Sequence, residues 1–118
     1  MKLRIFQIDA FTDSVFSGNP ACVVPLKEWL PKKTMLNIAK ENAVSETAFF
    51  IQNSHYFKLK WFTPEIEMDL CGHATLATAH AIYSILKLEK KEILFKTKSG
   101  NLSVKIKNGF YSMDLPSR

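Results

Sequence analysis

One glutamate in this sequence stands alone in an apolar segment. Glu46 is the only charged residue in the segment 43–51. A carboxyl group that is removed from water binds a proton more readily near neutrality, so Glu46 is a candidate general base. The alternative is a glutamate at the end of a strand that faces water or pairs with a lysine.

A second segment, 62–79, brings an acidic turn, a glycine and a histidine to the start of an apolar helix. Backbone N–H groups in the first turn of a helix have no partner within the helix and carry the positive end of its dipole. A carboxylate or enolate could therefore bind at this start. Gly72 would let such a ligand come close. His73 could instead be a structural residue that bonds to the preceding turn.

Cys71 directly precedes the same helix start. A cysteine at this position is favoured as a thiolate, although a buried structural cysteine is the alternative. We expect Cys22 and Cys71 to be free thiols, because two cysteines are too few for a disulfide framework. We expect no metal, since His80 follows His73 by seven positions along the helix, which places the imidazoles roughly 10 Å apart. His80 is expected to be a structural or surface histidine.

Hydrophobic periodicity predicts the elements that hold these residues. The expected strands are 3–11, 21–26, the Glu46 segment within 42–51, 56–62, 93–98, 102–107 and a last strand through 111–115. A short helix is expected after Pro31, with an apolar face at Met35, Ile38, Ala39 and Asn42. The central helix is expected to run from Gly72 to about Leu88.

The central helix has only a narrow polar stripe, so it should be surrounded by other elements. Its alanines would allow strands to approach closely. The predicted fold is α+β, with a strongly bent antiparallel sheet wrapped around the central apolar helix and a second, shorter helix outside.

Composition supports a single domain over residues 1–118, because 47% hydrophobic residues suffice for a core in a chain of this length. No apolar run reaches the ~18 to 20 residues of a membrane span, and the N-terminus lacks the apolar stretch of a signal peptide, so we expect a cytoplasmic protein without a membrane partner. The net charge is +5. Lysines alternate at 58 and 60, 96 and 98, and 105 and 107, which is typical of solvated sheet faces and not of a nucleic-acid surface.

Four motifs in order make the chain similar to the PhzF-like isomerases of phenazine biosynthesis, which are relatives of diaminopimelate epimerase. They are Asp9-Ala10-Phe11-Thr12, Gly18-Asn19-Pro20-Ala21, Ser45-Glu46-Thr47-Ala48-Phe49 and Gly72-His73. The resemblance implies that Glu46 transfers the proton and that His73 assists at the site. It implies substrate-binding roles for Asn19, Gly72, His73 and Ala74. Each half of the family's fold has the architecture predicted above.

Members of this family have two similar halves with the active site between them, and the chain of 118 residues resembles only the first half. The second half would contribute further acidic, serine and glycine residues. A cloned domain, a truncated reading frame and a natural single-domain relative that pairs with itself all stay open. A homodimer is the expected assembly.

The function that the sequence predicts is isomerisation of a small carboxylate-bearing substrate without a cofactor. One alternative is an amino-acid racemase or epimerase that uses Cys71, since related epimerases use paired thiols as acid and base. A non-catalytic ligand-binding half-domain that self-associates is another.

Overall fold

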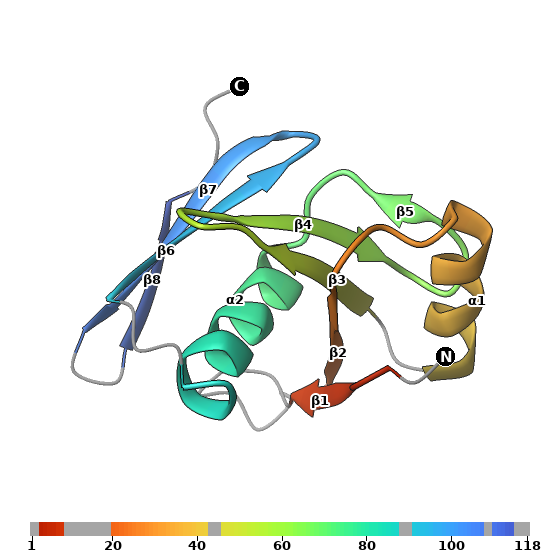
Figure 1. The fold of residues 1–118 in the computed structure, drawn as a ribbon, viewed down its shortest axis with the longest axis horizontal. Helices are drawn as coiled ribbons and strands as arrows, with labels where there is room; N and C mark the ends of the chain where they lie inside the picture. Colours follow the sequence, from red (N-terminus) through yellow and green to blue (C-terminus); the bar gives the residue numbers. More distant parts are fainter. Residues whose placement is uncertain (1–2, 9–19, 43–45, 88–90, 108–109, 115–118) are drawn as a thin grey trace.

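The computed structural model describes residues 3–8, 20–42, 46–87, 91–107 and 110–114. The strands in these ranges are β1 (Phe6–Ile8), β2 (Ala21–Leu26), β3 (Glu46–Gln52), β4 (Phe57–Phe62), β5 (Glu67–Met68), β6 (Glu92–Thr97), β7 (Gly100–Lys107) and β8 (Phe110–Asp114). The helices are α1 (Lys32–Asn42) and α2 (Gly72–His80), and a π-helical turn, η1 (Ala81–Ile85), continues α2. The strands form one sheet that curves around α2 (Figure 1).

The sheet runs in the order β1-β2-β3-β4-β6-β7-β8, and the short β5 pairs with β4. The α+β fold with a bent sheet around a central helix is confirmed. Two pairings differ from the predicted antiparallel sheet, because β2 and β3 are parallel and β4 and β6 are parallel. Parallel neighbours require a crossover connection, and α1 and α2 supply these two crossovers.

The concave face of the sheet holds the main core. Phe57, Leu59 and Trp61 alternate along β4 and are each 1% exposed, as the period of two predicts. On the neighbouring strand β3, Ala48 and Phe50 point to the same face. These side chains pack on the small residues of α2, so the central helix can lie close to the strands.

Helix α1 covers the opposite face of β3 and β4 (Figure 1). Its buried residues, Met35 and Ala39, pack on the alternate residues of the strands. Two of these, Phe49 and Phe62, meet edge to face with ring centroids 5.5 Å apart. The predicted outer helix is therefore present, and it packs on the side of β3 and β4 that faces away from α2.

The central helix is shorter than predicted, and its last turn is a wider π-helical turn. The N–H of Leu86 donates to the carbonyl of Ala81 at 2.8 Å, which closes the wide turn η1. Tyr83 and Ile85 in this turn are 37% and 39% exposed. Lys87, with φ of 54°, then turns the chain out of the helix.

The alternating lysines lie at the surface, as predicted. Lys58, Lys96, Lys98, Lys105 and Lys107 are exposed, and Lys60 is half-buried. Within the described ranges, no helix has the length and apolar character that crossing a bilayer requires.

His80, the last residue of α2, ties the helix to the edge strand β8. Its Nδ1 lies 3.0 Å from the hydroxyl of Tyr111, and the Ser84 hydroxyl lies 3.5 Å from both groups. This half-buried position fits the structural role predicted for His80. Burial lowers the pKa of the imidazole below its ordinary value.

Stability should therefore fall in mild acid. The unfolded chain binds a proton on His80 more readily than the folded chain, so the stabilisation is complete above a pH of about 6.5 and decreases as pH falls through that value. Between pH 7.5 and 5.5 the melting temperature should therefore drop, by an amount that solvent screening at this half-buried position keeps small. His80→Gln should flatten the dependence in thermal unfolding followed by circular dichroism. His55→Gln, at an exposed position, is the control and should keep the wild-type slope.

Candidate functional site

Glu46 opens strand β3 and shares the inner face of the sheet with Ala48 and Phe50. Its parallel partner is Ala21, the first residue of β2. The Glu46 side chain is half-buried. It therefore leaves the sheet at the start of β3, on the side that faces α2, and is only partly exposed to water.

The start of α2 lies directly beside this carboxyl group. The Sγ of Cys71, the residue before the helix, donates a hydrogen bond to Oε1 of Glu46 at 3.5 Å. The structure thus brings together the two segments that the sequence predicted to share a site.

The first turn of α2 lacks a side-chain cap. Cys71 occupies the N-cap position with extended backbone angles (φ −144°, ψ 99°), and its side chain makes no capping hydrogen bond. The first turn also contains no acidic residue. The helix itself therefore places no carboxylate at the positive end of its dipole. Among the described residues, the Glu46 carboxyl group lies beside this end, within hydrogen-bond distance of Cys71.

A buried hydrogen-bond chain holds this helix start against β4. The indole N–H of Trp61 donates to the hydroxyl of Thr75 at 3.0 Å, and that hydroxyl donates to the carbonyl of Cys71 at 2.8 Å. The N–H of Thr75 bonds to the same carbonyl at 3.1 Å. Trp61 and Thr75 are buried, so these bonds fix the position of Cys71 relative to the sheet. Neither residue was predicted to belong to the site, because in the sequence both have the pattern of ordinary core residues.

Gly72 has a structural reason in addition to the predicted one. A Cβ atom at this position would lie 3.0 Å from the terminal methyl carbon of Met113 on β8. The atom in contact is the flexible end of the Met113 side chain, which would have to shift slightly to admit a Cβ atom. The space that glycine leaves is therefore partly taken up by this side chain.

The protonation state of the Cys71 thiol differs from the predicted thiolate. Burial, the largest cause, raises its pKa to about 11, and the charge and hydrogen bond of Glu46 act in the same direction. The hydrogen bond from the backbone N–H of Ala74, which is the second-largest effect, and the weaker one from His73 lower the pKa, but they do not cancel the increase. The expectation that the helix start favours a thiolate was wrong, since desolvation and the neighbouring carboxylate outweigh the helix N–H groups.

Of the remaining residues that were predicted to belong to the site, some lie at the start of α2 and others lie outside the described residues. His73 is half-buried and Ala74 is buried, both in the first turn of α2. Asn19 lies outside the described residues, as does Asp9. Both cysteines are free, as predicted. Among the described residues, no three His, Cys, Asp or Glu side chains gather as a metal site would require.

Glu67 on β5 belongs to the acidic turn before the central helix, and its carboxylate is largely withdrawn from solvent. Its side chain is 12% exposed and lies 3.7 Å from the Lys32 ammonium and 4.0 Å from that of Lys98. The two lysines offset the loss of hydration, so a carboxylate is tolerated between α1 and the turn after β6.

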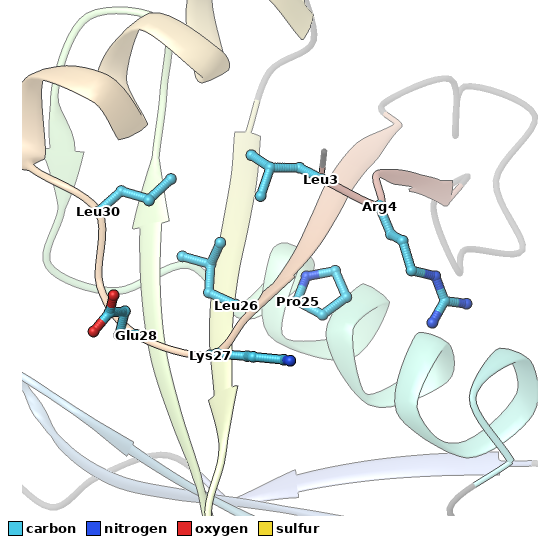
Figure 2. A pocket seen from close by; sticks show the side chains of 7 residues that line it. All are labelled: Leu3, Arg4, Pro25, Leu26, Lys27, Glu28 and Leu30. Atoms are coloured by element: carbon cyan, nitrogen blue, oxygen red, sulfur yellow. The ribbon is translucent and has the colours of Figure 1, made fainter. Parts of the chain in front are cut away.

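Two neighbouring cavities, of about 550 and 470 Å³, lie at the carboxyl end of β2. Both are lined by Arg4, Pro25, Leu26 and Lys27, and Figure 2 shows these side chains in the larger one. Because β2 and β3 are parallel, this end of the strands is opposite to the end that carries Glu46. The cavities are therefore separate from the candidate site.

Comparison with known proteins was informative over nearly the whole chain. Residues 8–115 match the PhzC-PhzF family model, described as phenazine biosynthesis-like protein. An uncharacterised isomerase of Pseudomonas aeruginosa is 48% identical over 118 residues, which are 100% of this chain and 46% of that protein.

Solved structures give the same result. The crystal structure of a PhzF-family phenazine biosynthesis protein from Enterococcus faecalis superimposes with a TM-score of 0.86 and 46% identity, over 94% of this chain and 43% of that one. A predicted epimerase from P. aeruginosa shares the fold, with a TM-score of 0.71 and 21% identity, over 93% of this chain and 41% of that one. This chain thus spans less than half the length of these relatives. The family match, the sequence identity and the superposition together show that this chain belongs to the PhzC-PhzF family of phenazine biosynthesis-like proteins.

Proposed function

We propose that this chain forms one half of the active site of a cofactor-independent isomerase that acts on a small carboxylate-bearing substrate. The single observation that carries the proposal is the position of Glu46, whose carboxyl group meets Cys71 at the uncapped start of α2. Family membership and the isomerase relatives support the reaction class.

In the proposed reaction, the substrate carboxylate binds at the first turn of α2, where Gly72, His73 and Ala74 offer backbone N–H groups and the helix dipole favours an anion. Asn19 would line the same pocket. The Glu46 carboxylate removes a proton from a carbon of the substrate, and the electron pair delocalises toward the bound carboxylate. The resulting acid returns the proton to another carbon of the conjugated system, with His73 assisting. No oxidant or reductant is needed, because the proton and the electron pair stay within the substrate and Glu46.

A second copy of the chain is the partner that we propose for completing the pocket. Relatives are more than twice as long as the matched segment, so their second halves supply surface that this chain alone does not have. The two free thiols fit a reducing compartment, and we propose the cytoplasm.

The amino-acid racemase or epimerase alternative uses Cys71 as a base. The raised pKa of the Cys71 thiol disfavours this role near neutrality, because a protonated thiol cannot remove a proton from carbon.

The family resemblance suggests a dihydro-hydroxyanthranilate as one possible substrate, because the reaction for which the family is named acts on such a compound. The test is solvent deuterium incorporation into this compound, followed by proton NMR. The mass of the sample is first determined by analytical ultracentrifugation. We expect the dimer to catalyse exchange, and we expect the carboxamide analogue of the same compound to exchange at least 10-fold more slowly, because it has no charge to place at the helix start. Equal exchange of the acid and the amide would contradict the proposed carboxylate site. A dimer that catalyses no exchange would favour the non-catalytic half-domain.

A further inference from the structure

We propose that Cys71 is a positioning residue for Glu46. The Cys71 thiol donates a hydrogen bond to the Glu46 carboxylate and holds it at the start of α2. The bond joins residues from two elements, since Glu46 opens β3 and Cys71 precedes α2, and the Sγ to Oε1 distance is 3.5 Å. The sequence predicted no positioning role for Cys71, which was considered only as the base of the alternative racemase or epimerase reaction.

The donor is held more firmly than the group that it positions. The Cys71 carbonyl accepts hydrogen bonds from the N–H and the hydroxyl of Thr75, and Thr75 in turn is held by Trp61. Cys71 is 7% exposed and has a single side-chain torsion that moves its sulfur. Glu46 has three torsions and a half-buried carboxyl group, so without a partner it would sample several rotamers. The thiol therefore restricts the carboxylate, and not the reverse.

The chemistry of the pair also fits a donor. Among the described residues, Glu46 is the charged group that acts on the Cys71 thiol, and it opposes formation of a second negative charge beside it. With burial, this keeps the thiol protonated at neutral pH, where it can donate but cannot act as a base or nucleophile.

The first experiment measures the pair directly and needs no substrate. The native chain is treated with iodoacetamide at pH 8, and alkylation of Cys71 and Cys22 is quantified separately by peptide mass spectrometry. Cys22 is a buried free thiol whose pKa is raised by burial alone, so it serves as the internal reference. The readout is the ratio of the Cys71 rate to the Cys22 rate, in which a general opening of the fold cancels.

Glu46→Gln should raise this ratio severalfold, because the pKa of the Cys71 thiol falls when the neighbouring charge is removed and the thiolate fraction increases. The increase is partial, because burial, the larger cause, remains in the variant. Glu41→Gln, which removes an exposed carboxylate from α1, should leave the ratio unchanged. A ratio that is the same in Glu46→Gln and in the wild-type chain would overturn the proposed pairing.

The second experiment tests the catalytic consequence, which rests on the proposed function. Cys71→Ser keeps a donor and should retain proton exchange within about threefold, whereas Cys71→Ala should lower kcat about 10-fold with little change in KM, because the base is less well placed. A merely structural role would instead change unfolding without separating Ser from Ala. If both variants abolish exchange, the thiol is itself a reacting group and the positioning role is wrong.

The two proposals can fail separately. If Glu46→Gln changes the alkylation ratio but not proton exchange, the pairing stands and Glu46 is not the base. If it abolishes exchange but leaves the ratio unchanged, Glu46 is the base and Cys71 does not position it.

Discussion

If the chain assembles into the proposed catalytically active dimer, Glu46→Gln is expected to lower the rate of solvent deuterium incorporation by about 1,000-fold. A general base contributes typically 10² to 10⁴ to the rate, and an amide cannot take up the proton. The substitution keeps the size of the side chain and an oxygen that can accept from the Cys71 thiol, so the geometry at the start of α2 should survive. The measurement is the proton NMR assay on the dihydro-hydroxyanthranilate, with wild type and variant at equal concentration.

The matched control is Glu41→Gln, which makes the same chemical change at an exposed position on α1 and should leave the exchange rate within twofold of wild type. Thermal unfolding of both variants checks that the fold is intact. Retention of more than a tenth of the wild-type rate by Glu46→Gln would exclude Glu46 as the essential base.

Trp61→Ala should destabilise the fold by about 3 to 5 kcal/mol. Trp61 is 1% exposed and lies in the main core beside the residues that pack on α2. The substitution leaves a cavity and also removes the donor that holds the Thr75 hydroxyl. Since small domains have total stabilities of about 5 to 15 kcal/mol, a large fraction of the margin would be lost. Urea unfolding at equilibrium measures the effect.

Two comparisons separate the causes of this loss. Trp29→Ala removes a half-buried indole that packs against the buried residues around α1. It should lower the free energy of unfolding by less than half as much as Trp61→Ala. Trp61→Phe keeps most of the apolar volume but not the N–H, so it should cost about 1 to 2 kcal/mol. If Trp61→Ala costs no more than Trp29→Ala, the central role given to Trp61 is incorrect.

Local periodicity was sufficient for most elements of this fold. The alternation of Phe57, Leu59 and Trp61 identified the inner face of β4, and the apolar helix after Gly72 identified the centre of the domain. Strand pairing was less accessible, because whether β2 pairs with β3 in parallel depends on the path of the chain through α1. The π-helical turn at the end of α2 was also missed, since one widened turn leaves no clear mark in the hydrophobic pattern.

The candidate site was predicted by motif, and its electrostatics were not. Resemblance to a family placed Glu46 and the start of α2 together, which the periodicity of either segment does not. The protonation of Cys71 depends on how deeply the sulfur is buried and on a neighbour from another strand, and neither is local in the sequence. The same holds for Glu67, whose two lysine partners come from distant segments.

The parallel pairing of β4 with β6 has a consequence for the folding pathway. These strands are joined through β5, α2 and η1, so their pairing brings together residues that are far apart in the sequence. Closing such a loop costs conformational entropy before the pairing compensates for it, so this fold should form more slowly than a simple meander. The hairpin of β6 and β7 can form from contacts that are local in the sequence. Its pairing with β4 also requires the intervening helix to be in place.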